Sequence, residues 1–349
     1  MKTRILTVDP FHPDPAVIAE AAQTLRSGGL VAFPTETVYG LGASALDSAA
    51  VARIFAAKDR PASDPLIVHI AERADLASVA VDLPPIVDAL ARRHFPGALT
   101  LVLKRHPRIA ANVSAGMDTV AVRMPAHPTA RALIAAAGVP VAAPSANRFS
   151  RPSATTAQHV LQDLDGRIDL ILDGGAALIG VESTILDVTV DPPAVLRPGG
   201  VPVETLRQSI PSLVVQSRFL SIDSPASAPG QMLKHYAPRA ELRLYIGSPE
   251  GMIARIAEEA RSLTAAGRRV GVLAAHEDSL DLPPQAVIIR LGSASDLDQI
   301  AVNLFSGMRA LDASEVDVIL ARDFGEGGLG LALRDRLTRA AEGRVIKVE

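Results

Sequence analysis

Short apolar runs alternate with amphipathic segments along most of the chain, and this alternation predicts strands separated by helices. A spacing of three to four residues between apolar positions predicts helices at 16–26, 48–57, 86–94 and 128–137. Apolar runs predict strands at 30–33, 66–70, 99–103, 120–124, 139–143, 170–172, 185–190 and 194–197. The alternation indicates an α/β domain with a twisted, mixed, open sheet and flanking helices over residues 1–210.

The pattern changes after residue 210. Small polar residues and proline dominate 221–229, a composition typical of a linker. Beyond residue 240 the alternation resumes and predicts a second, smaller, Rossmann-like α/β domain over 241–349, which leaves 211–240 as the connector. Its expected strands are 242–245, 270–273, 287–291 and 316–320, and its expected helices are 250–266, 297–311 and 329–341.

Composition narrows the class of protein. A length of 349 residues allows two domains of ordinary size. Hydrophobic residues make up 48% but aromatics only 3%, so the cores must consist of Ala, Val, Leu and Ile, which favours strands covered by helices. The absence of cysteine excludes disulfides, thiolate zinc sites and cysteine nucleophiles. With no apolar signal core and no membrane-spanning run, we expect a cytoplasmic protein without membrane contact.

Charge argues against stable nucleic-acid binding. Residues 1–210 hold 19 basic and 20 acidic side chains, and the whole chain has a formal net charge of −3. A general nucleic-acid binder would carry a cationic stripe, and none is visible in the sequence. Cations that bind a ligand must therefore act locally.

Two familiar nucleotide-binding motifs are missing or misplaced. None of the five lysines follows a glycine, so no P-loop exists. A formal G-x-G-x-x-G at 325–330 lies too close to the C-terminus for the acidic ribose ligand of a dinucleotide unit. We interpret these glycines as a tight entry into the last helix.

The run 33–42, FPTETVYGLG, indicates a site, because it places two hydroxyls, a carboxylate and a phenol in a loop after strand 30–33. Helix 48–57 then returns the chain and brings Lys58 and Arg60 beside that loop. Cations beside hydroxyls suggest a phosphate ligand. His69 ends an apolar strand, so its ring should lie at the strand end, where α/β sheets bind ligands.

Further polar motifs follow along the chain. With those already named, the set is Thr35/Glu36/Thr37/Tyr39, Lys58/Arg60, His69, Asp118-Thr119 with Arg123, Pro144-Ser145-Ala146-Asn147, Ser153, Glu182-Ser183-Thr184 and Arg197-Pro198-Gly199. The order and spacing of these motifs resemble the YrdC-like threonylcarbamoyl-AMP synthases. The connector motif at 228–238 and the C-terminal α/β domain resemble the long, two-domain members.

The resemblance implies that L-threonine, bicarbonate and ATP are joined into threonylcarbamoyl-AMP with release of pyrophosphate. The product would pass to a tRNA threonylcarbamoyl transferase complex, and Mg²⁺ would enter with ATP, with no metal site made by the protein. Lys58 and Arg60 are the expected catalytic residues, acting by position and charge. We expect their replacement to leave the fold intact, as for charges on a surface.

The resemblance also implies roles for individual residues. Residues expected to contact the nucleotide are Lys58, Arg60, Asp64, Thr119, Ser145, Asn147, Ser153, Arg197 and Tyr236. Those expected to contact threonine are Thr37, His69, Arg123, the backbone at Ala143, and Ser183, with the planar fork of Arg123 suited to the carboxylate. The connector is expected to act as a lid that crosses the active site, hinged at 224–229. Glu36 is assigned no role: base, cation partner and loop anchor all remain open.

Two other functions stay open. A carbamoyl-adenylating enzyme would share the fold, but such proteins carry cysteine-rich zinc modules that this chain lacks. A non-catalytic RNA-binding module is the second, and the net charge argues against it. Taken singly, Thr37 could cap a turn, Ser145 and Asn147 could form one, and Arg197 could be a solvated strand end.

Overall fold

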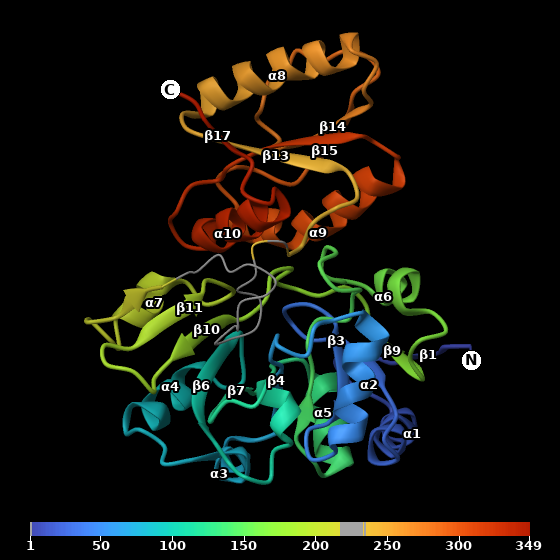
Figure 1. Cartoon of the computed structure of the whole chain (residues 1–349), viewed down its shortest axis with the longest axis vertical. Helices are drawn as coiled ribbons and strands as arrows, with labels where there is room; N and C mark the ends of the chain where they lie inside the picture. Colours follow the sequence, from blue (N-terminus) through green and yellow to red (C-terminus); the bar gives the residue numbers. More distant parts are fainter. Residues whose placement is uncertain (1, 217–232, 234) are drawn as a thin grey trace. The chain divides into compact units, whose positions relative to one another are not determined.

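The computed structural model describes residues 2–216, 233 and 235–349. The described residues form two compact units (Figure 1). The first contains those before residue 217 except Ser150–Pro152, and the second contains Ser150–Pro152 together with those from residue 233 onward. The domain limits predicted at 210 and 240 stay a prediction, since much of the connector lies outside the described residues.

The first unit is built from short elements in an irregular order. Its strands are β1 (Arg4–Thr7), β2 (Val31–Phe33), β3 (Gly40–Ser44), β4 (Ile67–His69), β5 (Ala80–Val81), β6 (Leu99–Arg105), β7 (Thr119–Arg123), β8 (Val141–Ala142), β9 (Leu170–Asp173), β10 (Thr184–Asp187), β11 (Ala194–Arg197) and β12 (Val214–Val215). Its helices are α1 (Pro15–Arg26), α2 (Ser48–Lys58), α3 (Leu76–Val79), α4 (Ile86–His94), α5 (Pro128–Ala137), α6 (Ala157–Leu164) and α7 (Val203–Arg207), with short 3₁₀ turns at Arg73–Asp75 and Ala111–Ser114.

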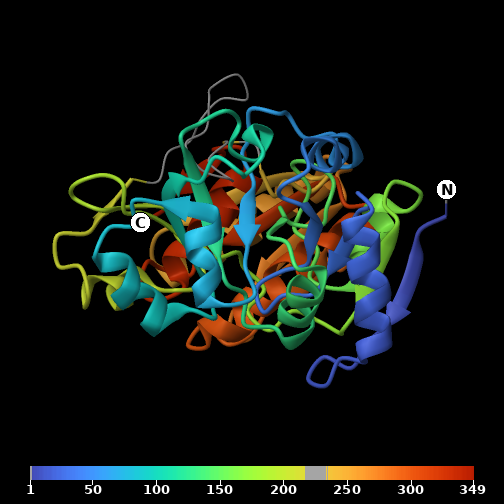
Figure 2. The ribbon, with the colours of Figure 1, turned by 90° about the horizontal axis from the view of Figure 1, so that it is seen from below.

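These strands form one mixed sheet in the order β1-β9-β2-β3-β8-β4-β7-β6-β10-β11-β12, with β5 paired to β6. Neighbours β4 and β7 are parallel, as are β6 and β10, whereas β2, β3, β8 and β4 are antiparallel in succession. The N-terminal strand β1 lies at the margin of the sheet (Figure 2). The predicted mixed α/β sheet is confirmed.

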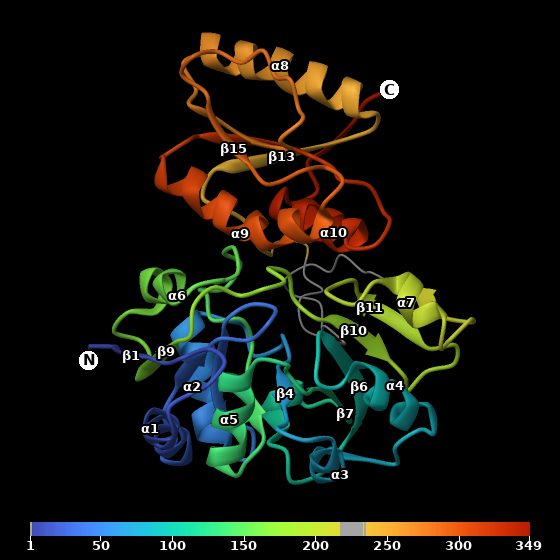
Figure 3. The same cartoon turned by 180° about the vertical axis from the view of Figure 1, so that it is seen from behind.

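Helices α1 and α5 pack side by side and cover part of this sheet (Figure 3). Asp14 caps α1 by accepting the amide of Ala16, and proline occupies the first turn, where no amide donor is needed. The core that both helices share with β2 and β9 includes Ile18, Leu25, Phe33, Leu133 and Leu172. This layer covers β2, the strand that leads into the loop with the candidate site residues.

Strand β3 was not expected, because glycines at both Gly40 and Gly42 weaken the strand pattern. The structure explains Gly42: a Cβ there would stand 2.8 Å from the Phe33 ring and from the Val141 side chain. The loop predicted over 34–42 is therefore shorter than expected, because its last residues, from Gly40 onward, belong to strand β3.

The second unit is a parallel α/β sheet in the order β15-β14-β16-β13-β17, which confirms the predicted class. Helix α8 covers one face, and α9 and α10 cover the other (Figure 1). Strand β16 separates β13 from β14, unlike the order of dinucleotide-binding units. The bounds are β13 (Glu241–Ile246), α8 (Pro249–Ala265), β14 (Val270–Ala274), β15 (Val287–Arg290), α9 (Leu297–Ala313), β16 (Val318–Arg322), α10 (Gly330–Ala340) and β17 (Val345–Lys347).

The glycine motif at 325–330 forms the entry into α10, as interpreted from the sequence. A Cβ at Gly330 would stand 2.7 Å from the Gly325 carbonyl oxygen, so only glycine allows this close approach. Gly325 and Gly328 have φ values of 87° and 56°, in the left-handed region that glycine tolerates.

Candidate functional site

The carboxyl ends of β4 and β7 bring His69 and Arg123 together. The two strands are parallel, and these residues are register partners. The predicted position of His69 at a strand end is confirmed. Its side chain is buried, and Nδ1 has no hydrogen-bond partner among the described residues. Burial and the nearby charge of Arg123 lower the pKa of His69 to about 3, so the ring is neutral at physiological pH.

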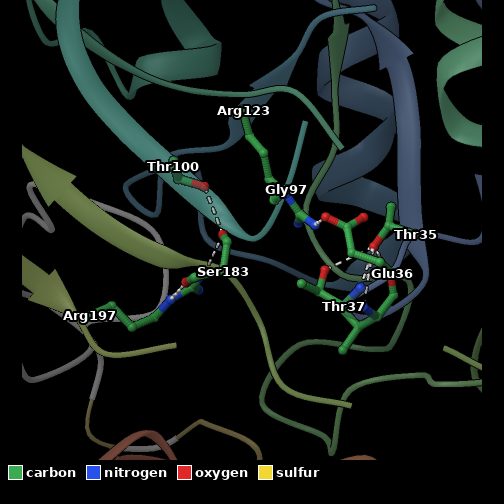
Figure 4. A network of polar contacts seen from close by, with 9 residues as sticks. Thr35, Glu36, Thr37, Gly97, Thr100, Arg123, Ser183 and Arg197 are labelled. Carbon is green, nitrogen blue, oxygen red and sulfur yellow. Dashed lines mark hydrogen bonds and ion pairs between the residues drawn. The ribbon is translucent and has the colours of Figure 1, made fainter. Parts of the chain in front are cut away.

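The loop after β2 is organised by one hydroxyl (Figure 4). The Thr35 Oγ1 donates to the Val38 carbonyl at 2.6 Å and accepts the Thr37 amide at 3.2 Å. The two threonine hydroxyls lie 2.9 Å apart. This compact turn buries Thr37 completely and fixes the direction of the side chain between them, Glu36.

Glu36 and Arg123 form a buried ion pair (Figure 4). Arg123 Nη2 lies 2.7 Å from Glu36 Oε1, and its Nε donates to the Gly97 carbonyl at 3.1 Å. The side chains are only 4% and 8% exposed. The backbone of Glu36 is also engaged, because its carbonyl accepts the amides of Leu178 and Ile179. The loop is therefore held from two sides.

A second network surrounds Ser183 (Figure 4). Its hydroxyl lies 2.7 Å from that of Thr100, and its carbonyl accepts Arg197 Nη2 at 2.9 Å. The chain passes so closely here that a Cβ at Gly199 would overlap the backbone of Glu182 and Ser183. A predicted threonine contact, Ser183, and a predicted nucleotide contact, Arg197, thus touch each other.

The end of α2 presents the cations that the sequence predicted. Asp47 caps the start of the helix by accepting two amides, and Asp59 ends it in the left-handed conformation with φ 55°. Lys58 Nζ donates to the Ser145 carbonyl at 2.6 Å and to the Asn147 carbonyl. The lysine therefore links α2 to the 145–147 loop.

Arg60 and Asp64 form the second buried pair, at 2.9 Å. Arg60 also donates to the backbone carbonyls of Asp64 and Pro65. The expectation that Lys58 and Arg60 act as surface charges is wrong, because they are only 1% and 7% exposed. Removing either takes hydrogen-bond donors away from buried acceptors, which costs about 1–3 kcal/mol for each bond lost.

The remaining predicted residues lie at separate points. In the first unit, Thr119 begins β7, the Ala143 amide donates to the Ile67 carbonyl, and Ser153 donates to the Glu182 carboxylate. Tyr236 belongs to the second unit, where its ring centroid lies 5.4 Å from that of Phe305. Its nucleotide contact stays a prediction. The predicted hinge 224–229 and Lys234 lie outside the described residues.

Four side chains of these networks were not among the predicted site residues. Thr35, Glu36 and Glu182 belonged to the quoted motifs but were given no role. Thr100 was missed, although a hydroxyl within the apolar run 99–103 is a signal that could have found it. In the described part of the chain, no three His, Asp or Glu side chains are arranged to hold a metal ion. None of the described helices is both long and apolar enough to cross a membrane.

Comparisons with known proteins agree along the whole chain. The family model described as "Telomere recombination" matches residues 23–199, and that described as "Threonylcarbamoyl-AMP synthase, C-terminal domain" matches 201–342. The threonylcarbamoyl-AMP synthase of Pyrococcus abyssi is 46% identical, over 94% of this chain and 95% of its own. That of Bacillus subtilis is 43% identical, over 99% and 100%.

The fold agrees as well. The crystal structure of P. abyssi Sua5 complexed with L-threonine superimposes with a TM-score of 0.94 at 44% identity, covering 99% of this chain and all of that one. Identity at this level over both units places the two proteins in one family. The chain therefore belongs to the threonylcarbamoyl-AMP synthase family, in its long, two-domain form.

Proposed function

We propose that this chain joins L-threonine, bicarbonate and ATP into threonylcarbamoyl-AMP and releases pyrophosphate. The observation that carries the proposal is the buried guanidinium of Arg123 at the end of β7, beside the neutral ring of His69. A relative that matches almost the whole chain was solved with L-threonine, which supports this substrate. Family membership supports the reaction as a whole.

On the threonine side, Arg123 would bind the carboxylate. Nε and Nη2 already have partners in Gly97 and Glu36, whereas Nη1 makes no hydrogen bond to the described residues. A guanidinium held on one edge offers the other to a carboxylate in a fixed orientation. Neutral His69 would accept or donate one hydrogen bond to threonine, as would Thr37 and Ser183.

On the nucleotide side, Lys58, Arg60 and Arg197 would stabilise phosphate charge. The threonine amine captures carbon dioxide as a carbamate, whose oxygen attacks the α-phosphorus while pyrophosphate leaves. Negative charge remains on phosphate oxygens throughout, so fixed cations lower the barrier without a protein nucleophile. We assign Asp64, Thr119, Ser145, Asn147, Ser153 and Tyr236 to nucleotide binding, and Ala143 to threonine.

Magnesium would arrive with ATP, because this ion prefers phosphate oxygens and water. The buried carboxylates of Asp64 and Glu182 are bound to Arg60 and Ser153, which supports an ion held mainly by the triphosphate. The product would pass to a tRNA threonylcarbamoyl transferase complex in the cytoplasm.

Mass spectrometry tests the proposal directly. The protein is mixed with ATP, magnesium, L-threonine and ¹³C-bicarbonate, and the product should be threonylcarbamoyl-AMP that contains the label. Omitting threonine or bicarbonate in turn should abolish both the product and pyrophosphate release. Formation of carbamoyl-AMP from carbamoyl phosphate and ATP without threonine would support a carbamoyl-adenylating enzyme instead. Binding to tRNA with no adenylate formed would support an RNA-binding module.

A further inference from the structure

Only one of the two oxygens of the Glu36 carboxylate has a partner among the described residues. Oε1 is paired with Arg123, but Oε2 is buried and has no hydrogen-bond partner among the described residues. An ionised oxygen removed from water without a donor is costly, and proteins rarely keep one unless it serves a purpose. The second oxygen therefore indicates a missing donor at this point of the site.

The position of the missing donor is fixed by the pair itself. The two oxygens share one carbon, so a group that reaches Oε2 lies beside the guanidinium of Arg123. If Arg123 binds the carboxylate of an amino acid, the nearest strong donor on the same molecule is the α-ammonium, one carbon away. A carboxylate is the strongest partner that a protein can offer to an ammonium group.

Resting on the proposed function, we infer that Glu36 Oε2 binds the α-ammonium of threonine. The Glu36–Arg123 pair then holds both charges of the zwitterion: the guanidinium holds the substrate carboxylate and Oε2 holds the substrate ammonium. Glu36 thereby contacts the substrate directly, besides holding Arg123. No bond is made or broken in this step.

The surroundings favour this role over that of a plain ion pair. The turn made by Thr35 and the two amides on the Glu36 carbonyl fix the backbone on both sides of the residue. The carboxylate itself is held by its ion pair with Arg123, which it would have to break to reach solvent. The loop and the arginine together therefore set its orientation, with Oε1 paired and Oε2 without a partner among the described residues.

The inference makes Glu36 a specificity residue. The site should discriminate strongly between L-threonine and (R)-3-hydroxybutanoate, which keeps the carboxylate and hydroxyl but lacks the amine. Losing one charge-assisted contact corresponds to an affinity change of about tenfold or more. A residue that only positioned Arg123 would support both ligands equally.

Calorimetry on the full chain tests this with the two ligands and two variants. Wild-type protein should bind threonine about tenfold or more tighter than (R)-3-hydroxybutanoate. Glu36→Gln keeps an acceptor for Arg123 but removes the charge, so the preference should fall to within about twofold. Glu250→Gln, an exposed carboxylate at the start of α8, is the matched control and should keep the full preference.

Each outcome has a distinct meaning. A wild-type protein that binds both ligands equally overturns the inference. This comparison needs no variant, so the inference can still be tested if Glu36→Gln does not fold. Equal weakening of both ligands in Glu36→Gln reduces Glu36 to a positioning residue for Arg123 and also overturns it. A wild-type protein that binds no threonine overturns the proposed function together with the inference.

Discussion

Two buried arginine–carboxylate pairs, one in each unit, look alike in sequence and differ in structure. Arg123 ends strand β7 and pairs with Glu36, and Arg322 ends strand β16 and pairs with Asp278. In the second pair both carboxylate oxygens are used, since Arg322 binds Oδ1 and the Ala275 amide donates to Oδ2 at 2.8 Å.

The difference shows what separates a structural ion pair from a binding site. Both pairs are buried and join one arginine to one carboxylate. They differ in the number of carboxylate oxygens that have a partner: both oxygens of Asp278 have one, whereas Glu36 Oε2 has none among the described residues. The following variants test this distinction, from the largest expected effect to the smallest.

Replacing either arginine should lower the stability of the protein, but only the replacement of Arg123 should stop threonine binding. Arg123→Met and Arg322→Met each leave a buried carboxylate without its cation, which costs about 3–5 kcal/mol of unfolding free energy. Threonine affinity should fall about ten- to hundredfold or more in Arg123→Met, with ATP affinity little changed. Urea unfolding and separate titrations with each ligand measure the two effects.

The double variants serve as controls. Neutralising both partners, in Arg322→Met/Asp278→Asn, should recover part of the lost stability because no isolated charge remains. Arg123→Met/Glu36→Gln should recover stability in the same way but not threonine binding. Equal loss of threonine and ATP affinity in Arg123→Met would assign this arginine to the nucleotide.

Lys58→Met tests a buried cation that donates to two carbonyl oxygens. The variant keeps the aliphatic stem but loses the donor to Ser145 and Asn147, so the unfolding free energy should fall by about 1–3 kcal/mol. Pyrophosphate release should fall by about 10²–10³-fold, the usual effect of removing one charge-stabilising donor. A folded variant with full activity would remove Lys58 from catalysis.

Gly199→Ala and Gly327→Ala compare a crowded glycine with an open one. A Cβ at Gly199 would overlap the backbone of Glu182 and Ser183, whereas none of the described atoms lies within 4 Å of one at Gly327. Overpacking should cost the first variant about 1–3 kcal/mol and displace Ser183, raising KM for threonine. The second should match wild type in both thermal unfolding and kinetics.

The depressed pKa of His69 gives stability a pH dependence with a definite sign. Between pH 6.5 and about 3 the unfolded chain binds a proton at this residue that the folded chain does not, so stability falls as pH falls. The slope from one such group is at most about 1.4 kcal/mol per pH unit. His69→Asn should flatten denaturant midpoints measured from pH 7 to 4, and an unchanged slope would contradict the assignment.

Most of the helices and strands could be predicted from the sequence, but little of the atomic detail could. Helices α4 and α5 and strand β11 begin and end at the residues predicted, because their apolar spacing is strong and their ends have clear stop signals. Strand β3 was missed because its glycines are required by a ring and a side chain from other strands, which a local pattern cannot reveal.

The candidate site, too, was only partly predictable from the sequence. The strand-end position of His69 followed from an apolar run that ends in a polar residue. The burial of Lys58 did not, since its acceptors come from a loop almost ninety residues further along the chain. The missing partner of Glu36 Oε2 could not be predicted either, because it depends on how a single side chain is oriented.

The loop that meets the Glu36 carbonyl offers a way to follow the site without any substrate. Leu178 has a side chain that is 65% exposed, yet its amide and that of Ile179 donate to Glu36, and the Gly180 amide donates to Thr37. Amide hydrogen exchange at these three residues therefore reports opening of the threonine loop rather than solvent contact. Their protection factors would measure the fraction of time for which this loop stays closed, with its hydrogen bonds formed, in the unliganded protein.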